Sequence, residues 1–351
     1  MSQHTVFRAR PHLRLTAFAA LGAAALALTA CAGGTGAGST PGGDGGGEAK
    51  PAAIDAVKVI APADPGGGWD QTARALAQSL TDAKLVSSAP VSNIGGAGGT
   101  VGLASLKTET DPNTLMVTGS VMVGAVETNQ SEVRIEDMTA VAKLTEEPLI
   151  VVVPPDSEYD SMEDFVEAWA KAGADMAVTG GSAGGIDHIL AGMLLTDAGV
   201  DSADVPDTLN YIANSGGGEA LTMLLGGQVD AGISGVGEFA EQIKAGKLKA
   251  LAVSSAEPAE LLPDVPTLAD EGIDITLTNW RGLLAPGDLD DAQVSALQDL
   301  VTQLHESESW TATLEEKGWT DAFLTGDEFT SFLESDIATT QDTLRTIGLI
   351  E

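Results

Sequence analysis

Short runs of β-branched and aliphatic residues alternate with amphipathic segments along most of the chain, and this alternation limits the folds available to it. Residues 57–60 and 115–118 have strand length, whereas residues 69–80 and 160–172 carry apolar side chains at helical spacing. Strands that alternate with helices form a mostly parallel sheet with helices on both faces. The pattern therefore predicts an α/β fold.

The alternation continues through the rest of the chain and suggests two lobes. Further strands are expected at 149–153, 176–178, 208–212, 231–233, 248–253 and 273–277, and helices at 186–198, 219–225, 238–245 and beyond 290. The runs 149–153 and 248–253 have the arrangement of two connecting strands at one hinge, the first leading out and the second leading back. We therefore expect residues 55–153 and 252–351 to form lobe one, and residues 154–251 to form lobe two.

The first thirty residues have the pattern of a secretion signal. Arg8, Arg10 and Arg14 precede or open an apolar run at 15–28 that is too short to make a good membrane span. Residues 28–31 read Leu-Thr-Ala-Cys and resemble the lipobox of bacterial lipoproteins, whose cysteine is lipidated. We expect a signal peptide over 1–30, lipidation of Cys31 and a flexible glycine-rich tether over 31–54. The alternative is a chance cysteine behind an ordinary signal peptide.

Acidic residues outnumber basic ones, with 51 Asp and Glu against 17 Lys and Arg and a formal net charge of −34. Such a chain lacks the basic face that nucleic-acid binding requires, and its folded body does not adsorb to anionic lipid. The 43% hydrophobic content allows a buried core, so the charge does not indicate disorder. The single cysteine excludes an internal disulfide.

Glycine clusters stand at five predicted junctions between a strand and a helix. They lie at residues 65–68, 95–99, 119–120, 180–185 and 215–218. The first turn of a helix has unpaired N–H groups and a partial positive charge, and glycine lets a ligand approach that backbone closely. These loops therefore favour a site that holds a small anion. The alternative is that the glycines serve only to make tight turns.

Other ligand classes and catalytic motifs fail on their spacing. The only Gly-Lys step is followed by Leu248, so no phosphate-binding P-loop is present, and no G-x-G-x-x-G pattern occurs. No histidine or cysteine spacing fits a metal, and Gly232-Ile233-Ser234-Gly235-Val236-Gly237 has the wrong spacing for a G-x-S-x-G elbow. His188 opens a helix after a glycine loop, where it is either a ligand contact or a structural residue. We expect no cofactor, no metal and no catalytic residue.

Seven short motifs, taken in order over residues 57–290, resemble the extracytoplasmic substrate-binding receptors of the tripartite tricarboxylate transporters. They are Pro65-Gly66-Gly67-Gly68-Trp69-Asp70 with Arg74, Asn93-Ile94-Gly95-Gly96-Ala97-Gly98-Gly99-Thr100, Asp111-Pro112-Asn113-Thr114-Leu115, Gly181-Ser182-Ala183-Gly184, Leu225-Gly226-Gly227-Gln228-Val229-Asp230, Val265-Pro266-Thr267-Leu268-Ala269-Asp270-Glu271-Gly272 and Asn279-Trp280-Arg281-Gly282. Each motif is weak alone, but seven in order are specific.

The resemblance implies a two-lobe, type II periplasmic-binding-protein fold with the ligand in the cleft between the lobes. It implies a di- or tricarboxylate ligand, large and small membrane subunits as partners, and a monomer anchored by lipid on the outside of the cell membrane. It implies ligand contacts from Gly67, Gly68, Trp69, Asp70, Gly98, Gly99, Thr100, Ser120, Ser182, Ala183 and Gly184. To these we add His188, Ser215, Ser234 and Trp280 as candidates.

The chain departs from the family pattern at two places, and two other functions stay open. Asp187 is unfavourable beside an anion unless it caps its helix or meets an amine or a metal. The lysine of a Tyr-Lys-Gly motif is missing after Tyr211, which leaves the charge class of the ligand open. One alternative is an extracellular hydrolase or transferase using Asp70, Asp187, Asp230 and His188. Another is a signalling receptor with the same fold.

Overall fold

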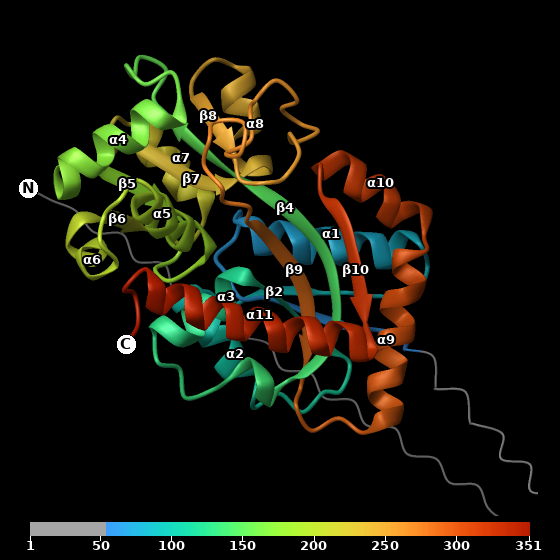
Figure 1. The fold of residues 1–351 in the computed structure, drawn as a ribbon. Helices are drawn as coiled ribbons and strands as arrows, with labels where there is room; N and C mark the ends of the chain where they lie inside the picture. The colour runs from blue at the N-terminus through green and yellow to red at the C-terminus, as the bar shows by residue number, and fades with distance from the viewer. Residues whose placement is uncertain (1–53) are drawn as a thin grey trace, which may run out of the picture. The chain divides into compact units, whose positions relative to one another are not determined.

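The computed structural model describes residues 54–351, which fold into a sheet covered by helices (Figure 1). The predicted signal peptide, Cys31 and all but the last residue of the predicted tether lie outside the described residues. Within residues 54–351 no helix is both long enough and apolar enough to cross a bilayer. The predicted α/β class is confirmed by the ten strands of this region and the helices packed on them.

The described chain opens with three strand–helix units. The strands are β1 (Lys58–Ala61), β2 (Val91–Asn93) and β3 (Thr114–Gly119), and the helices that follow them are α1 (Gly68–Asp82), α2 (Thr100–Leu106) and α3 (Ser120–Thr128). β1 lies between β2 and β3 and runs parallel to both. Trp69, Ala73, Leu76 and Leu80 recur at helical spacing on α1 and join the core beneath the strands.

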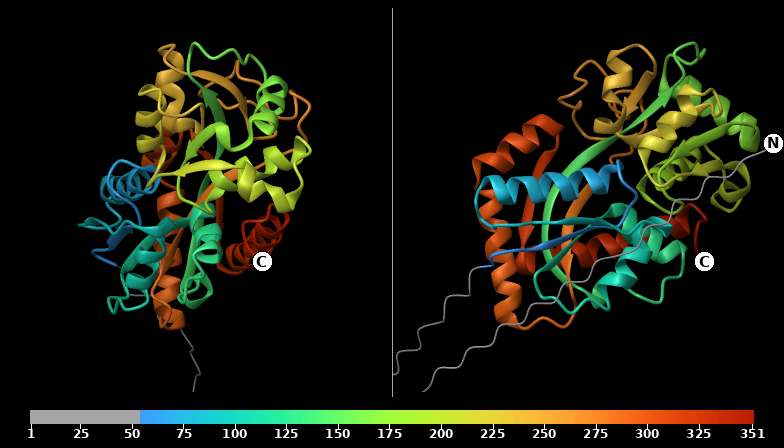
Figure 2. Two further views of the ribbon diagram at one scale, coloured as in Figure 1. Left: turned by 90° about the vertical axis from the view of Figure 1, so that its left-hand side faces the viewer. Right: turned by 180° about the vertical axis from the view of Figure 1, so that it is seen from behind.

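A single long strand, β4 (Thr139–Val153), takes part in both halves of the sheet (Figure 2). Its first part pairs with β9 (Thr278–Ala285), and its last residues pair with β7 (Ala231–Gly235) and β8 (Lys249–Val253). Because side chains alternate along a strand, Leu149 and Val151 enter one core while Ile150 and Val152 enter another. Burial on both faces explains why residues 149–153 are apolar at every position.

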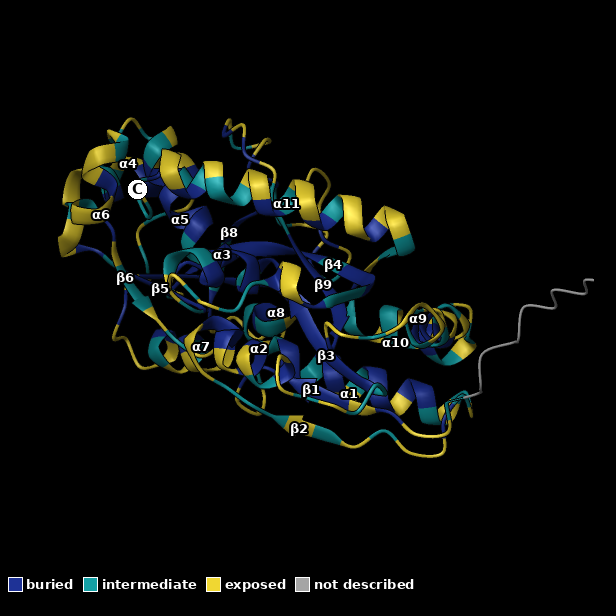
Figure 3. Cartoon of the chain, turned by 90° about the horizontal axis from the view of Figure 1, so that it is seen from below, coloured by how far each residue is buried: buried dark blue, intermediate teal, exposed yellow. Residues whose placement is uncertain are grey.

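The segment between β4 and β9 forms a second group of elements. It contains α4 (Met162–Ala172), β5 (Ala177–Gly180), α5 (Ile186–Asp197), α6 (Val205–Thr208), β6 (Asn210–Ala213), α7 (Gly217–Leu225) and α8 (Val236–Lys244). β5 runs parallel to β6 and β7. α4 and α5 contribute to the core on one face of these strands, and α7 and α8 to the core on the other. Figure 3 shows β4 and β9 buried and helices whose outer faces are exposed, whereas the edge strands β2 and β6 are only partly buried.

The C-terminal region corrects two predictions. It consists of β9, α9 (Asp291–His305), α10 (Glu308–Lys317), β10 (Thr320–Thr325) and α11 (Gly326–Thr346). The strand expected at 273–277 does not form, since the Ile275 N–H bonds back to the Ile273 carbonyl at 2.9 Å and the chain enters the sheet only at Thr278. The region beyond residue 290 is mostly helical as expected, but it also contains β10, which was not expected and which pairs with β4. That pairing is long-range, so local sequence does not encode it.

The sheet is mixed rather than mostly parallel. The parallel pairs lie among β1, β2 and β3 and among β5, β6 and β7, whereas every pairing of β4 and β9 is antiparallel. The buried apolar residues separate accordingly. One core draws on residues 57–144 and 280–337, and two others draw on residues 149–275.

Candidate functional site

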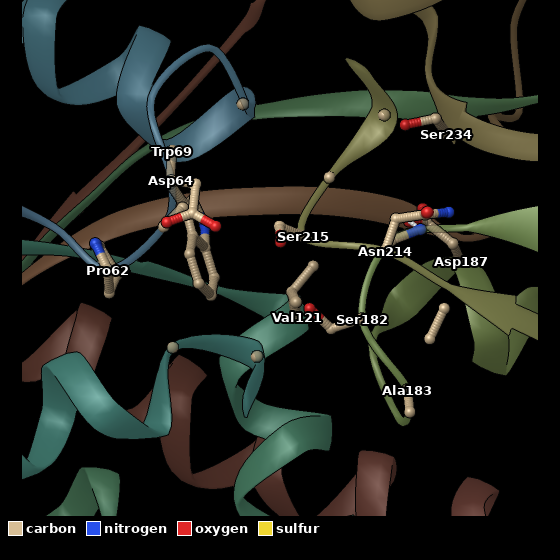
Figure 4. Close-up of a pocket in the computed structure, with 18 of the residues that line it drawn as sticks. Pro62, Asp64, Trp69, Val121, Ser182, Ala183, Asp187, Asn214, Ser215 and Ser234 are labelled. Carbon is tan, nitrogen blue, oxygen red and sulfur yellow. Dashed lines mark hydrogen bonds between the residues drawn. The ribbon is translucent and has the colours of Figure 1, made fainter. Parts of the chain in front are cut away.

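A cavity of about 300 Å³ lies where the glycine loops of the two groups of elements meet (Figure 4). In Figure 4, Asp64 and Trp69 lie on one side, Asn214, Asp187 and Ser234 lie on the other, and Ser215 lies between them. The cavity is lined by Pro62, Ala63, Asp64, Gly68, Trp69, Gly96, Ala97, Gly98, Gly99, Val121, Asn129, Asn279 and Arg281 from the first core region, and by Gly181, Ser182, Ala183, Asp187, Ala213, Asn214, Ser215, Gly216, Gly217, Ser234, Gly235 and Glu238 from the second.

Helices that begin around this cavity have glycine N-caps without a side-chain hydrogen bond. The N-caps of α1, α3, α5, α7 and α8 are Gly67, Gly119, Gly185, Gly216 and Gly235. By contrast, Ser161, Asp290 and Ser307 cap α4, α9 and α10 with their side chains. Helix N–H groups near the cavity are therefore left for a ligand to use, as the sequence predicted from the glycine clusters.

Eight of the predicted site residues line the cavity and seven do not. The eight are Gly68, Trp69, Gly98, Gly99, Ser182, Ala183, Ser215 and Ser234. The seven outside the lining are Gly67, Asp70, Thr100, Ser120, Gly184, His188 and Trp280. Gly67 is the N-cap of α1, and the hydroxyl of Thr100 bonds back to the Ala97 carbonyl at 2.9 Å.

Asp70 is buried and bonded to the loop before α1 and to β2 rather than presented to the cavity. Its carboxylate accepts hydrogen bonds from the Gly66 N–H at 2.9 Å and from the Asn93 side chain at 2.8 Å. It also pairs with Arg74 at 2.9 Å. Burial raises the pKa of Asp70, but the hydrogen bonds from Arg74 and Asn93 outweigh burial and lower it overall. Asp70 thus fixes the loop that precedes α1.

His188 and Gly184 stabilise the loop before α5. The Gly184 N–H donates to Nδ1 of His188 at 3.0 Å, and the imidazole stacks on Tyr211 with ring centroids 4.2 Å apart. Burial lowers the pKa of His188 to about 4, so the ring is neutral at pH 7 and its Nδ1 can accept. The Tyr211 hydroxyl donates to the Gly181 carbonyl at 3.1 Å. The structural reading of His188 therefore fits its contacts.

Trp280 was predicted from its motif, but its neighbours on β9 reach the cavity instead. Successive side chains on a strand point to opposite faces. Asn279 and Arg281 line the cavity, while Trp280 lies in the opposite core and donates through Nε1 to Asp336 at 3.0 Å. The backbone N–H of Trp280 also donates to the Ser120 hydroxyl at 3.2 Å, which explains why Ser120 is not free to face the cavity.

Sequence reasoning missed a buried ion pair beneath the cavity. Arg281 pairs with Glu147 of β4, and each side chain is 4% exposed. Burial raises the pKa of Glu147, and the Arg281 guanidinium opposes that rise. Gly68 packs against this pair so closely that an added Cβ would lie 2.5 Å from an Arg281 nitrogen. The only sequence signal was that Arg281 stood in a recognised motif.

Two further acidic residues reach the cavity from the second group of elements. The Gly181 N–H donates to Asp187 at 2.7 Å, but burial dominates and raises the Asp187 pKa to about 7. Glu238 accepts from the Ser234 hydroxyl at 2.5 Å. Asp187 therefore holds the loop before α5 through the Gly181 N–H and does not cap its own helix, whose N-cap is Gly185.

Three polar atoms of cavity-lining side chains are buried without a hydrogen-bond partner. They are Oδ1 of Asn279, Oε1 of Glu238 and Nε of Arg281. Two are acceptors and one is a donor. Leaving such groups unpaired costs about 1–3 kcal/mol each.

The acids proposed for a hydrolase do not converge. Asp70 pairs with Arg74, His188 accepts from the backbone, and Asp230 accepts from the Ala177 N–H at 2.8 Å on an exposed surface. Among residues 54–351 no three His, Cys, Asp or Glu side chains gather closely enough to hold a metal ion. The arrangement is suited to holding a small polar molecule between two walls.

Comparisons with known sequences agree with this geometry. The model of the tripartite tricarboxylate transporter receptor family matches residues 72–349. An Agrobacterium vitis protein, the UPF0065 protein in the TAR-I ttuE-ttuC' intergenic region, is 33% identical over 255 residues, which are 69% of this chain and 71% of the relative. Protein BugT of Bordetella pertussis is 28% identical over 298 residues, 83% of this chain and 89% of its own.

Solved structures share the fold. The periplasmic binding protein BugD is similar with a TM-score of 0.75 and 21% identity, over 84% of this chain and 98% of its own. MatC from Rhodopseudomonas palustris, solved with malate, has a TM-score of 0.70 and 22% identity over 82% and 98% of the two chains. Rpa4515 of R. palustris, solved with adipate, has a TM-score of 0.74 and 21% identity over 83% and 97%.

Proposed function

Because this chain belongs to the tripartite tricarboxylate transporter receptor family, we propose that it captures a small organic carboxylate in the cavity between its two lobes. The family is one of receptors, so the chain is an extracytoplasmic solute receptor and not an enzyme. The single observation that carries the proposal is the cavity itself, into which uncapped glycine N-termini converge from both lobes. MatC and Rpa4515, of the same fold, were solved with malate and adipate.

The carboxylate would be held chiefly by backbone N–H groups. The N-caps of α1 and α7 lie next to each other, since a Cβ at Gly216 would be 3.5 Å from Cα of Gly67. Gly68, Trp69 and Gly217 of the first turns of these helices line the cavity. Arg281 adds a buried guanidinium with Nε unpartnered. Hydrogen bonds to a charged group contribute about 1.5–3 kcal/mol each, so two or three of them support micromolar affinity.

The two lobes would close around the ligand about β4 and β9. We place lobe one at residues 55–153 together with the C-terminal segment, and lobe two on the segment between, as expected from the sequence. The return to lobe one is set at residue 278 rather than 252, since Leu268, Ile273 and Ile275 pack in a core of the second group. The chain then passes from lobe one to lobe two on β4 and returns on β9, and these two strands pair with each other.

The transport role adds partners that lie outside the cavity. We propose that Cys31 anchors the protein by lipid at the outer side of the cell membrane, and that the closed form delivers its ligand to large and small membrane subunits. Cys31→Ser would release the protein from membranes, because the described residues contain no helix able to span a bilayer. Unchanged membrane retention of that variant would contradict the anchor.

Mass spectrometry of what co-purifies with residues 32–351, followed by isothermal titration of organic acids, tests the proposed function. We expect one carboxylic acid to be recovered and to bind back at one per chain, with heat that saturates and no chemical change in the acid. A turnover product, or the absence of any carboxylate ligand from both measurements, would contradict it.

A further inference from the structure

The charges around the cavity do not suit a ligand that is only an anion. Asp187 and Glu238 reach the cavity from lobe two, while Arg281 is already neutralised by Glu147. Asp64 also lines the cavity, but it is exposed and screened by solvent. Two like charges 4 Å apart repel by about 4 kcal/mol at an effective dielectric constant of 20. A carboxylate held next to Glu238 therefore needs a compensating positive charge, and Asp187 adds to that need wherever it is ionised.

The buried polar atoms without a hydrogen-bond partner also indicate a ligand that is more than an anion, and this argument does not depend on charge. Asn279 is 7% exposed and its Oδ1 has no donor, and Oε1 of Glu238 has none either. The Asn279 side chain lowers the pKa of Glu147 in the way a hydrogen-bond donor does, which places its amide nitrogen toward Glu147 and leaves its oxygen unpaired. A plain di- or tricarboxylate offers only acceptors and would leave both oxygens unpaired.

Whereas Asn279 and Glu238 lack a hydrogen-bond donor, Arg281 lacks an acceptor. Its Nε is a buried donor without an acceptor, on the same face of β9 as Asn279. A ligand that satisfies all three side chains must carry an acceptor for Arg281 and N–H or O–H donors for Asn279 and Glu238. Of these donors only a protonated amine also supplies the positive charge that Glu238 calls for. The described residues offer no cluster of acids that would hold a metal ion in place of those donors.

We propose that the ligand of this receptor is an amino-substituted carboxylic acid, whose ammonium group donates to Glu238 and Asn279 and whose carboxylate binds Arg281 and the glycine N-termini. The inference rests on the proposed function and narrows its substrate class. In Figure 4, Trp69 at the start of α1 lies on one side of the cavity, and Ser234, whose hydroxyl donates to Glu238, lies on the other.

Paired titrations test the inference. Residues 32–351, freed of bound ligand and kept in EDTA, are titrated with succinate and aspartate, glutarate and glutamate, and adipate and 2-aminoadipate. Each pair differs only by an amino group. We expect the amino member of the best-binding pair to bind at least tenfold more tightly than its plain counterpart.

Two variants on α8 assign that preference to the cavity. Glu238→Gln removes the charge beside the cavity and should reduce the preference at least tenfold while the plain acid binds as well or better. Glu241→Gln makes the same change one turn along, on a side chain that is 84% exposed, and should leave the preference intact. The paired titrations of the unmodified protein still test the ligand class even if Glu238→Gln fails to fold.

The possible outcomes distinguish failure of the ligand-class inference from failure of the proposed receptor function. If the plain acids bind as tightly as the amino acids, the ligand-class inference is overturned and the carboxylate receptor remains. If binding of plain acids appears only when Ca²⁺ or Mg²⁺ replaces EDTA, a metal supplies the positive charge and the inference is equally overturned. If no acid of either kind binds, the proposed function fails and the inference with it.

Discussion

Arg281 of β9 and Glu147 of β4 form a buried ion pair at the point where β4 passes from one half of the sheet to the other. Leu149, two residues after Glu147, already pairs with β7. The pair therefore joins the wall of the cavity to the strand that links the two lobes. It also packs against Gly68 at the start of α1, so the geometry of the cavity depends on it.

Breaking this pair should destabilise the protein strongly. Arg281→Met leaves Glu147 buried without its partner, and we expect the free energy of unfolding to fall by about 3–5 kcal/mol. Adding Glu147→Leu removes the stranded carboxylate and should recover most of that loss. Urea denaturation of both variants measures it. A double variant that loses as much stability as the two single variants together would contradict a coupled pair.

Ligand binding should require glycine at residue 68 but not at residue 67. An alanine Cβ at Gly68 would lie 2.5 Å from an Arg281 nitrogen, whereas at Gly67 the nearest atom would be 3.8 Å away. We expect Gly68→Ala to weaken ligand binding at least tenfold by displacing Arg281, and Gly67→Ala to change it little. Isothermal titration with the co-purified ligand measures both.

Arg74 provides a second control for the same site. Its side chain is 55% exposed, pairs with Asp70 and does not line the cavity. Arg74→Gln should therefore leave affinity within about tenfold, that is, within 1.4 kcal/mol. Loss of binding in Arg74→Gln together with normal binding in Gly68→Ala would mean that the anion is held by a different cation.

Much of this site followed from local sequence, because glycine clusters at strand-to-helix junctions are visible without tertiary information. The positions of Asn279 and Arg281 did not follow, since the motif around Trp280 was not recognised as a strand and the alternation of its side chains was not applied. Glu147 lies 134 residues from Arg281 along the chain, so nothing local marks the two as partners. Strand β10 was missed for the same reason, because only its pairing with β4 makes residues 320–325 a strand.

Asp187 and His188 should make opposing contributions to the pH dependence of stability. The pKa of Asp187 is raised to about 7 by burial, so the folded state binds more protons and this contribution falls as pH rises from about 4 to about 7. The pKa of His188 is lowered to about 4, so the unfolded state binds more protons and its contribution rises with pH up to about 6.5. The largest change in the free energy of unfolding is about 4 kcal/mol from Asp187 and about 3 kcal/mol from His188. The His188 contribution is smaller in practice, because its side chain is partly exposed.

Single substitutions should reveal each contribution. Relative to the unmodified protein, Asp187→Asn should gain stability as pH rises from 4.5 to 7.5, and His188→Asn should lose it up to pH 6.5. The charged groups that act on Asp187 are Glu238, Glu147 and Arg281, and all three stay in place in both variants. Urea unfolding across this range gives the differences. Parallel pH curves for all three proteins would contradict the assigned shifts.

Closure of the lobes should depend on contact between α3 and the loop before α5. A Cβ at Gly124 of α3 would lie 2.0 Å from the carbonyl oxygen of Gly184, so Gly124→Ala cannot keep the observed approach of α3 to the loop before α5. Alanine is more favourable than glycine inside a helix, so the same change should stabilise α3 itself by about 1 kcal/mol. We therefore expect ligand affinity to fall at least tenfold while the free energy of unfolding stays equal or rises. Small-angle scattering with ligand should show a more extended particle than the unmodified protein, and Gly218→Ala, which meets no atom within 4 Å, should behave normally. A variant that binds and compacts like the unmodified protein would show that the lobes need not meet at this contact to hold the ligand.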